Sequence, residues 1–147
     1  MPALAFVHNR VRDEITFHLH DHLEAHREQG TSVAEQFFPI ATDTVFGPDV
    51  AFISAEQIPR ITQMTPPFSP ALVVEVASPS NRLGWLAHKT KLYLEAGTKR
   101  VWIADTEMRE IRIYSASAPP RLLSGADRLE DPLLPGFSVT VDELFDV

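Results

Sequence analysis

The chain has no cysteine and few glycines, and both scarcities exclude particular kinds of site. Without cysteine there is neither a disulfide framework nor a thiolate metal site, which fits a cytosolic protein. The six glycines are scattered and form no G-x-G-x-x-G or G-x-x-x-x-G-K motif, so phosphate-cradling loops of these types are not expected. A G-x-S-x-G nucleophile motif is also missing from the sequence. Carboxylate, histidine and lysine side chains are left as the candidates for chemistry.

Positive charge is scarce as well. The 13 lysines and arginines are outnumbered by 20 aspartates and glutamates, which gives a net charge of −7. Because phosphate binding depends on clustered Lys and Arg, this balance argues against a general nucleic-acid-coating role, but not against an enzyme with a local basic cleft or an acidic metal site. No apolar run approaches the roughly 18 residues of a membrane span, and the first residues do not resemble a signal peptide. We therefore expect one domain, residues 1–147, in the cytoplasm and without a membrane partner.

Helical and extended segments follow one another along the chain. Apolar residues and histidines recur at three- and four-residue spacing over residues 8–28, which predicts a helix that Gly30 ends. Ser78-Pro79-Ser80 offers a turn and an N-cap for a second helix over residues 81–96, which Gly97 stops. The predicted strands lie in residues 31–41, 47–54, 72–77, 100–105, 110–116, 121–124 and 137–141, before a last helical turn at 141–147. This order predicts an α/β protein with a mixed sheet flanked by two main helices.

Two features attract attention without being the preferred site. In "FHLHDHLEAH", His18, His22 and His26 lie one turn apart on one helix face and could bind a transition metal. We favour the interpretation that they line the half-buried side of an amphipathic helix, since such sites need a further ligand and a pocket. Trp85 and Trp102 are expected to be packing residues rather than stacking platforms.

The stretch "PALVVEVASPSN" places Glu75 in the middle of an apolar strand. An isolated carboxylate in such a place costs several kcal/mol, roughly, unless a cation, a metal or hydrogen-bond donors meet it. Asp49 follows Pro48 at the start of the preceding strand. Two carboxylates at the ends of neighbouring strands can chelate one hard divalent cation, with the Val76 carbonyl and waters completing an octahedron. A structural ion pair between Glu75 and an Arg or Lys explains the same spacing equally well.

A lysine beside such a metal can orient or deprotonate the attacking water and offset charge on a phosphate. Two lysines on the second predicted helix compete for this role. Lys89 lies about 60° from Leu86 around the helix axis, on the margin of the stripe expected to pack, whereas Lys91 points almost to the opposite side. We therefore expect Lys89, and not Lys91, to face Glu75.

Taken in order, these segments resemble the Uma2 family (also called DUF820), restriction endonucleases of the PD-(D/E)xK fold. The resemblance rests on His8 at the start of the first helix, "PDV", "LVVEVASPSN", Lys89 with Tyr93 and "EAG", "VWIAD", and "DPLLPGFSVTVDELF". It covers nearly the whole chain from His8 on. It implies a restriction-endonuclease-like mixed sheet and Mg²⁺- or Mn²⁺-dependent hydrolysis of DNA phosphodiester bonds. By the same resemblance, Asp49, Glu75 and Lys89 are catalytic residues, and Asp49, Glu75 and Val76 hold the metal.

The chain departs from the family pattern in two places. Trp85 stands where the family's helix usually carries Asp, four residues before the lysine. Family members also tend to begin with an acidic "E-x-x-d-G-e" hairpin, and this chain starts at what would be its far end, so we expect a domain shortened at the N-terminus. A shortened sheet would expose an edge and favour a homodimer. These departures keep a second interpretation open, a catalytically degenerate module that binds or dimerises.

Overall fold

The computed structural model describes residues 3–77 and 83–147. The helices are α1 (Leu4–Ala25), α2 (Leu83–Glu95), α3 (Val141–Phe145) and a short 3₁₀ turn, η1 (Ile58–Arg60). The strands are β1 (Gly30–Ala34), β2 (Phe38–Ala41), β3 (Thr44–Phe46), β4 (Val50–Ser54), β5 (Leu72–Ala77), β6 (Arg100–Asp105), β7 (Glu110–Tyr114), β8 (Arg121–Ser124), β9 (Arg128–Leu129) and β10 (Val139–Thr140).

The main sheet has six strands in the order β1-β4-β5-β6-β7-β8. Only β5 and β6 run parallel, and α2 makes the crossover between them; the other neighbours are antiparallel. The predicted α/β class, with a mixed sheet flanked by helices, is therefore confirmed. β2 and β3 form a separate hairpin, and β9 pairs with β10.

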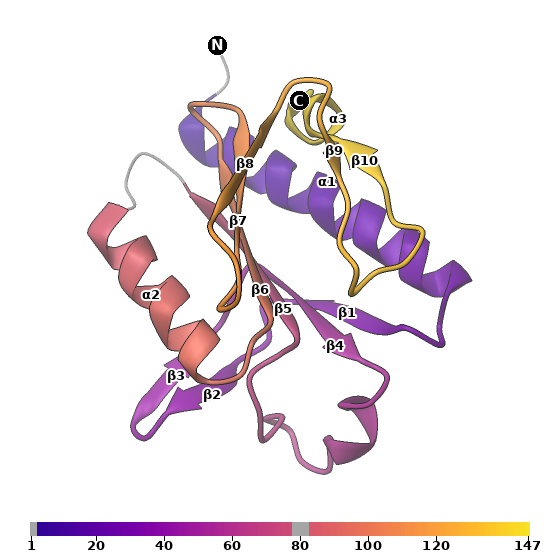
Figure 1. The fold of residues 1–147 in the computed structure, drawn as a ribbon, viewed down its shortest axis with the longest axis vertical. Helices are drawn as coiled ribbons and strands as arrows, with labels where there is room; N and C mark the ends of the chain where they lie inside the picture. The colour runs from indigo at the N-terminus through magenta and orange to yellow at the C-terminus, as the bar shows by residue number, and fades with distance from the viewer. Residues whose placement is uncertain (1–2, 78–82) are drawn as a thin grey trace.

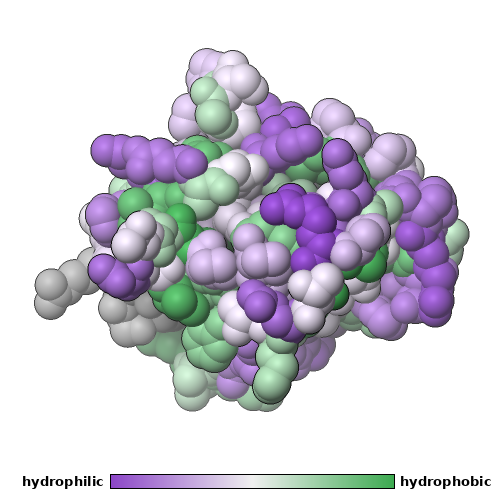
Figure 2. Space-filling view, turned by 90° about the horizontal axis from the view of Figure 1, so that it is seen from below, coloured by the Kyte–Doolittle hydropathy of each residue, from purple (hydrophilic) through white to green (hydrophobic). Residues whose placement is uncertain are grey.

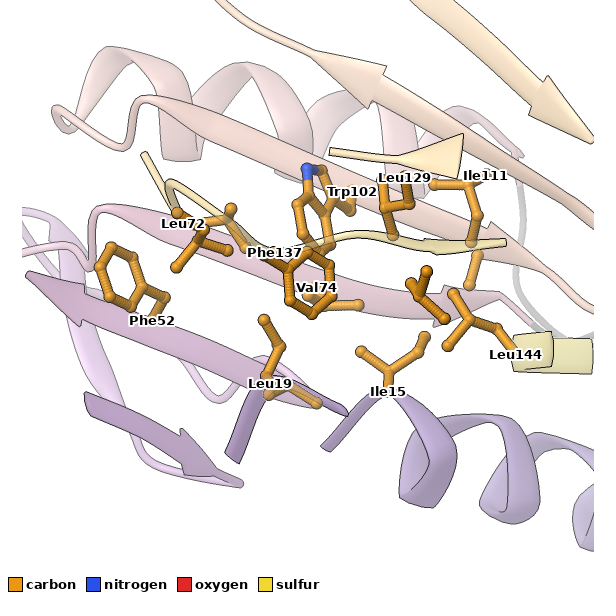
Figure 3. Packing of buried hydrophobic residues seen from close by; sticks show 14 of the residues in the cluster. Ile15, Leu19, Phe52, Leu72, Val74, Trp102, Ile111, Leu129, Phe137 and Leu144 are labelled. Atoms are coloured by element: carbon orange, nitrogen blue, oxygen red, sulfur yellow. The ribbon is translucent and has the colours of Figure 1, made fainter. Parts of the chain in front are cut away.

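The helices cover the two faces of this sheet separately (Figure 1). On one face, α1 and α3 pack against the strands; Ile15, Leu19 and Leu144 meet Val74 and Trp102 there (Figure 3). On the other face, Leu86 and Tyr93 of α2 are buried in a second apolar cluster. Burial of each such side chain contributes about 1.5–3 kcal/mol. Because side chains alternate along a strand, β5 gives Val74 to the α1 face and Glu75 to the α2 face.

Several predicted boundaries need correction. The first helix begins at Leu4 rather than at residue 8. It ends at Ala25 rather than at residue 28, because His26 takes a non-helical backbone conformation, with φ −136° and ψ 55°. The strand predicted at 137–141 is reduced to β10, since Thr140 caps α3 in a capping box with Glu143. The segment 31–41 is divided into β1 and β2, with Glu35 at a φ of 55° between them.

Three short elements were not predicted as such: β3, β9 and η1. The Ser78-Pro79-Ser80 turn and the first residues of the predicted 81–96 helix lie outside the described residues. The remainder of that helix agrees with α2.

Candidate functional site

Asp49 and Glu75 lie side by side at one end of the sheet. Val50 pairs with Val74 across β4 and β5, so the antiparallel register places Asp49 opposite Glu75. The Asp49 N–H donates to Glu75 Oε1 over 3.1 Å, and the Val76 N–H donates to Asp49 Oδ2 over 2.7 Å. Each carboxylate is thus held by the main chain of the neighbouring strand. The sheet itself fixes the separation of the two acids.

Glu75 is buried, with 5% of its surface exposed, and α2 covers it. Lys89 of α2 donates to Glu75 Oε2 and forms an ion pair with it. Burial raises the pKa of the Glu75 carboxyl above its ordinary value, although the Lys89 ammonium acts in the opposite direction. Lys91 has 73% of its side chain exposed and pairs with Glu95. The structure therefore brings Lys89, and not Lys91, to Glu75.

Two aromatic side chains surround the Lys89–Glu75 pair. The Lys89 Nζ lies 5.1 Å from the centroid of the Phe46 ring, and Phe46 contacts Tyr93 edge-on at 5.4 Å. Tyr93 is fully buried, and its hydroxyl finds no hydrogen-bond partner among the described residues. Burial, together with the negative charges of Glu75 and Asp49, holds the pKa of this hydroxyl well above its ordinary value. Tyr93 is therefore a neutral wall of the site.

His8 was not among the predicted site residues, although it was noted as the start of the first helix. Its Nε2 lies 3.7 Å from Asp49 Oδ1, the oxygen that the Val76 N–H leaves free. α1 packs on the opposite sheet face, so its first turns reach Asp49 around the end of the sheet. No signal in the sequence pointed to this contact other than the place of His8 at the start of the predicted helix, because 40 residues separate His8 from Asp49 in the chain.

The donor set suits a hard divalent cation. Asp49 and Glu75 supply carboxylate oxygens, and the hydrogen bond from the Val76 N–H joins Val76 to Asp49. Mg²⁺ is typically bound by one or two carboxylates, with waters and substrate phosphates filling the remaining positions. Within residues 3–77 and 83–147, no group of three or more histidine, aspartate or glutamate side chains is arranged to hold a metal ion.

The three histidines of α1 are engaged in other contacts. His22 Nε2 hydrogen-bonds Gln29 Oε1 at 2.9 Å, and His26 Nδ1 hydrogen-bonds the His22 carbonyl at 2.8 Å. The His22 and His26 rings stack at 4.3 Å, while His18 lies 3.7 Å from Glu14. This arrangement is that of a partly buried helix face.

Of the two tryptophans, only Trp102 behaves as the sequence interpretation requires. It is 1% exposed and stacks on Phe137. Trp85 instead leaves 50% of its surface in solvent, one helical turn before Lys89, and meets Phe46 edge-on at 6.0 Å. The prediction that Trp85 is a packing residue therefore holds only for the half of its surface that is buried.

Comparisons with known proteins identify the family and the fold. The model of the Uma2 family, described as "Putative restriction endonuclease", matches residues 1–142. A crystal structure of "a putative nuclease belonging to DUF820" from Anabaena variabilis superposes with a TM-score of 0.86 at 16% sequence identity. The superposition covers 99% of this chain and 83% of that one, and at this identity it shows the shared fold. No curated protein matches the chain. In the part of the chain that the structure describes, no helix is both long enough and apolar enough to span a bilayer.

Proposed function

The chain belongs to the Uma2 family, and from this premise we propose that it is a divalent-metal-dependent endonuclease that hydrolyses DNA phosphodiester bonds. The observation that carries the proposal is the convergence of Asp49, Glu75 and Lys89. Asp49 directly precedes β4, Glu75 lies in β5 and Lys89 lies in α2, and main-chain and side-chain hydrogen bonds join them. A carboxylate pair with an adjacent lysine is the arrangement that metal-assisted attack on a phosphate needs.

Asp49, Glu75 and the Val76 carbonyl would hold the Mg²⁺ or Mn²⁺ ion. When bound, the ion would polarise the phosphate and stabilise the negative charge that develops on it. Asp49 suits this role because its Oδ1 accepts no hydrogen bond from the neighbouring strand, whereas Oδ2 is held by Val76. Glu75 suits it because a buried carboxylate gains most from a cation.

Lys89 orients the water that attacks phosphorus and offsets charge on the phosphate oxygens. The water loses one proton as its oxygen forms a new P–O bond, the bond to the leaving sugar oxygen breaks, and that oxygen takes up one proton, so that hydrolysis adds one water across the bond. Phe46 and Tyr93 restrict the positions open to the Lys89 ammonium. His8, 3.7 Å from Asp49, is placed to hold this carboxylate in position.

A cleavage assay tests the proposal. Wild type and the variants Glu75→Ala, Lys89→Ala and Lys91→Ala are incubated with single-stranded and duplex DNA in Mg²⁺ or Mn²⁺. Cleavage should disappear in the first two variants and persist in Lys91→Ala, which removes an exposed lysine from the same helix. Cleavage that survives both Glu75→Ala and Lys89→Ala would refute the assignment.

The second candidate is a degenerate module that binds or dimerises without catalysis. The half-exposed Trp85, which occupies the place of a family acid, and the net charge of −7 favour it. Calorimetric titration with Mn²⁺ separates the two candidates. Binding that Asp49→Asn and Glu75→Gln abolish supports the nuclease, and no binding at millimolar Mn²⁺ supports the module.

We further propose that residues 1–147 are a single domain that acts as a homodimer. The edges of the described six-stranded sheet are β1 and β8, and both could pair with a second copy. Sedimentation equilibrium measures this directly: a monomer at all concentrations would contradict it.

A further inference from the structure

Two aromatic side chains beside the site lie largely in solvent. Trp85 is 50% exposed and Phe37, which precedes β2, is 60% exposed. The Phe37 ring covers Gly47, since a Cβ added there would lie 3.0 Å from two of its ring atoms. Gly47 is two residues before Asp49 in the chain. Trp85 and Phe37 therefore stand next to the segments that carry Lys89 and Asp49.

Phe46 connects Trp85 to the site. Its ring contacts Trp85 at 6.0 Å, and the same ring lies 5.1 Å from Lys89 Nζ. The edge-on contact, with an angle of 86° between the rings, uses only part of the Trp85 surface. Figure 2 shows that hydrophobic residues gather on the left of the face seen from below, the side on which α2, β2 and β3 lie in Figure 1. The exposed half of the Trp85 surface is therefore available for contact with another molecule.

The net charge of the protein does not distinguish a duplex from a single strand. With a net charge of −7, and with Lys89 paired to Glu75, phosphate contacts supply little affinity for either of them. The difference between the two lies in their bases, because stacking of a base on an aromatic ring contributes to binding for any base sequence. A base in a duplex has both faces covered by its neighbours, so an unpaired or extruded base is the one that can stack on a side chain.

We propose that Trp85 and Phe37 stack on unpaired bases that flank the scissile phosphate, so that single-stranded DNA, or an unpaired segment of a duplex, is the preferred substrate. This inference rests on the proposed function, because only a nuclease has a scissile phosphate. The stacking itself is a binding property that does not require cleavage.

Tryptophan fluorescence tests the contact directly. The chain has two tryptophans, and because Trp102 is 1% exposed, quenching by a bound oligonucleotide reports on Trp85. Without metal, an oligothymidylate should quench the emission, and a duplex of the same length should bind more weakly. Anisotropy of a labelled oligothymidylate should show affinity about 5- to 150-fold lower for Trp85→Ala. Phe37→Ala should also weaken binding. Phe17→Ala, a control that removes a 60% exposed ring from α1, should not.

Equal affinity for duplex and single strand, no binding of either, or equal affinity of Trp85→Ala and Phe17→Ala would overturn the inference. If Trp85→Ala alters sedimentation but not DNA affinity, the surface is a contact between copies and the inference is also wrong. Cleavage tests the proposed function separately from binding. Glu75→Ala and Lys89→Ala should lose cleavage while they still bind the oligothymidylate. Cleavage that both variants retain would refute the proposed function and leave the stacking inference standing.

Discussion

Removing the Lys89 charge should destabilise the protein much more than removing the Glu75 charge. Lys89→Met leaves the Glu75 carboxylate buried beside Asp49 without its cation, whereas Glu75→Gln leaves Lys89 free to turn toward water. Loss of one partner of a buried ion pair typically costs about 3–5 kcal/mol, because the other charge stays buried. The Lys89 side chain is 16% exposed, so water screens the pair partly and the lower end of this range applies.

We therefore expect Lys89→Met to lower the free energy of unfolding by about 3 kcal/mol at pH 8, or the melting temperature by about 6–12 °C. Glu75→Gln keeps the shape of the side chain and should stay within about 1 kcal/mol of wild type. The loss in Lys89→Met should shrink as the pH falls. Because burial raises the pKa of Glu75 in the folded state above its unfolded value, the folded variant binds a proton that the unfolded chain does not yet bind.

Urea unfolding of wild type and the two variants at pH 8 and pH 5, followed by circular dichroism, measures these differences. Lys91→Met, which changes an exposed lysine on the same helix, is the control and should lie within about 0.5 kcal/mol of wild type. A loss in Lys89→Met that is the same at both pH values would refute the reasoning. So would a loss no larger than that of the control.

Three further outcomes are expected. At a Mn²⁺ concentration about 100 times its Kd, wild type should gain about 2.7 kcal/mol in a thermal-shift assay; Asp49→Asn should gain almost nothing, and an equal gain would place the ion elsewhere. Tyr93→Phe should raise the unfolding free energy by about 1 kcal/mol in urea, because it removes a buried hydroxyl that has no partner among the described residues; a loss above 1 kcal/mol would reveal a partner. Gly30→Ala should abolish or severely weaken folding, as judged by soluble yield and melting temperature, because the Cβ would lie 2.1 Å from the Ile53 carbonyl oxygen at a φ of +141°. Gly84→Ala, whose Cβ meets no described atom within 4 Å, should be tolerated.

The sheet could be predicted because its strands carry strong local signals. Continuous apolar runs identified β5 and β6, whereas their parallel pairing across the intervening helix is a finding of the structure. The predicted start of the first helix was four residues too late. No capping residue marks the true boundary, because the N-cap residue is Ala3, which has no side-chain hydrogen bond. β10 was overestimated because Thr140 suits a strand by propensity but acts as an N-cap in its context. Propensity alone does not separate these two roles.

The candidate site could be predicted where chain order and helical periodicity determine it. Glu75 stood out as an acid in an apolar strand, and the helical angle distinguished Lys89 from Lys91. His8 and the exposed half of Trp85 could not be anticipated, because both depend on how elements distant in sequence meet at the end of the sheet. The hydrogen bonds between Asp49 and β5 likewise follow from the register, which a single sequence does not specify.

The register of β4 and β5 also determines when, during folding, Asp49 and Glu75 come together. Asp49 reaches Glu75 only when Val50 stands opposite Val74, and a slip of one residue would turn Asp49 to the other face of the sheet. β4 and β5 are joined by a long loop, so their pairing is a non-local event that follows the formation of helices. Nascent, misregistered or partly unfolded copies therefore lack the centre altogether. Whatever chemistry it performs is confined to molecules that have completed their folding.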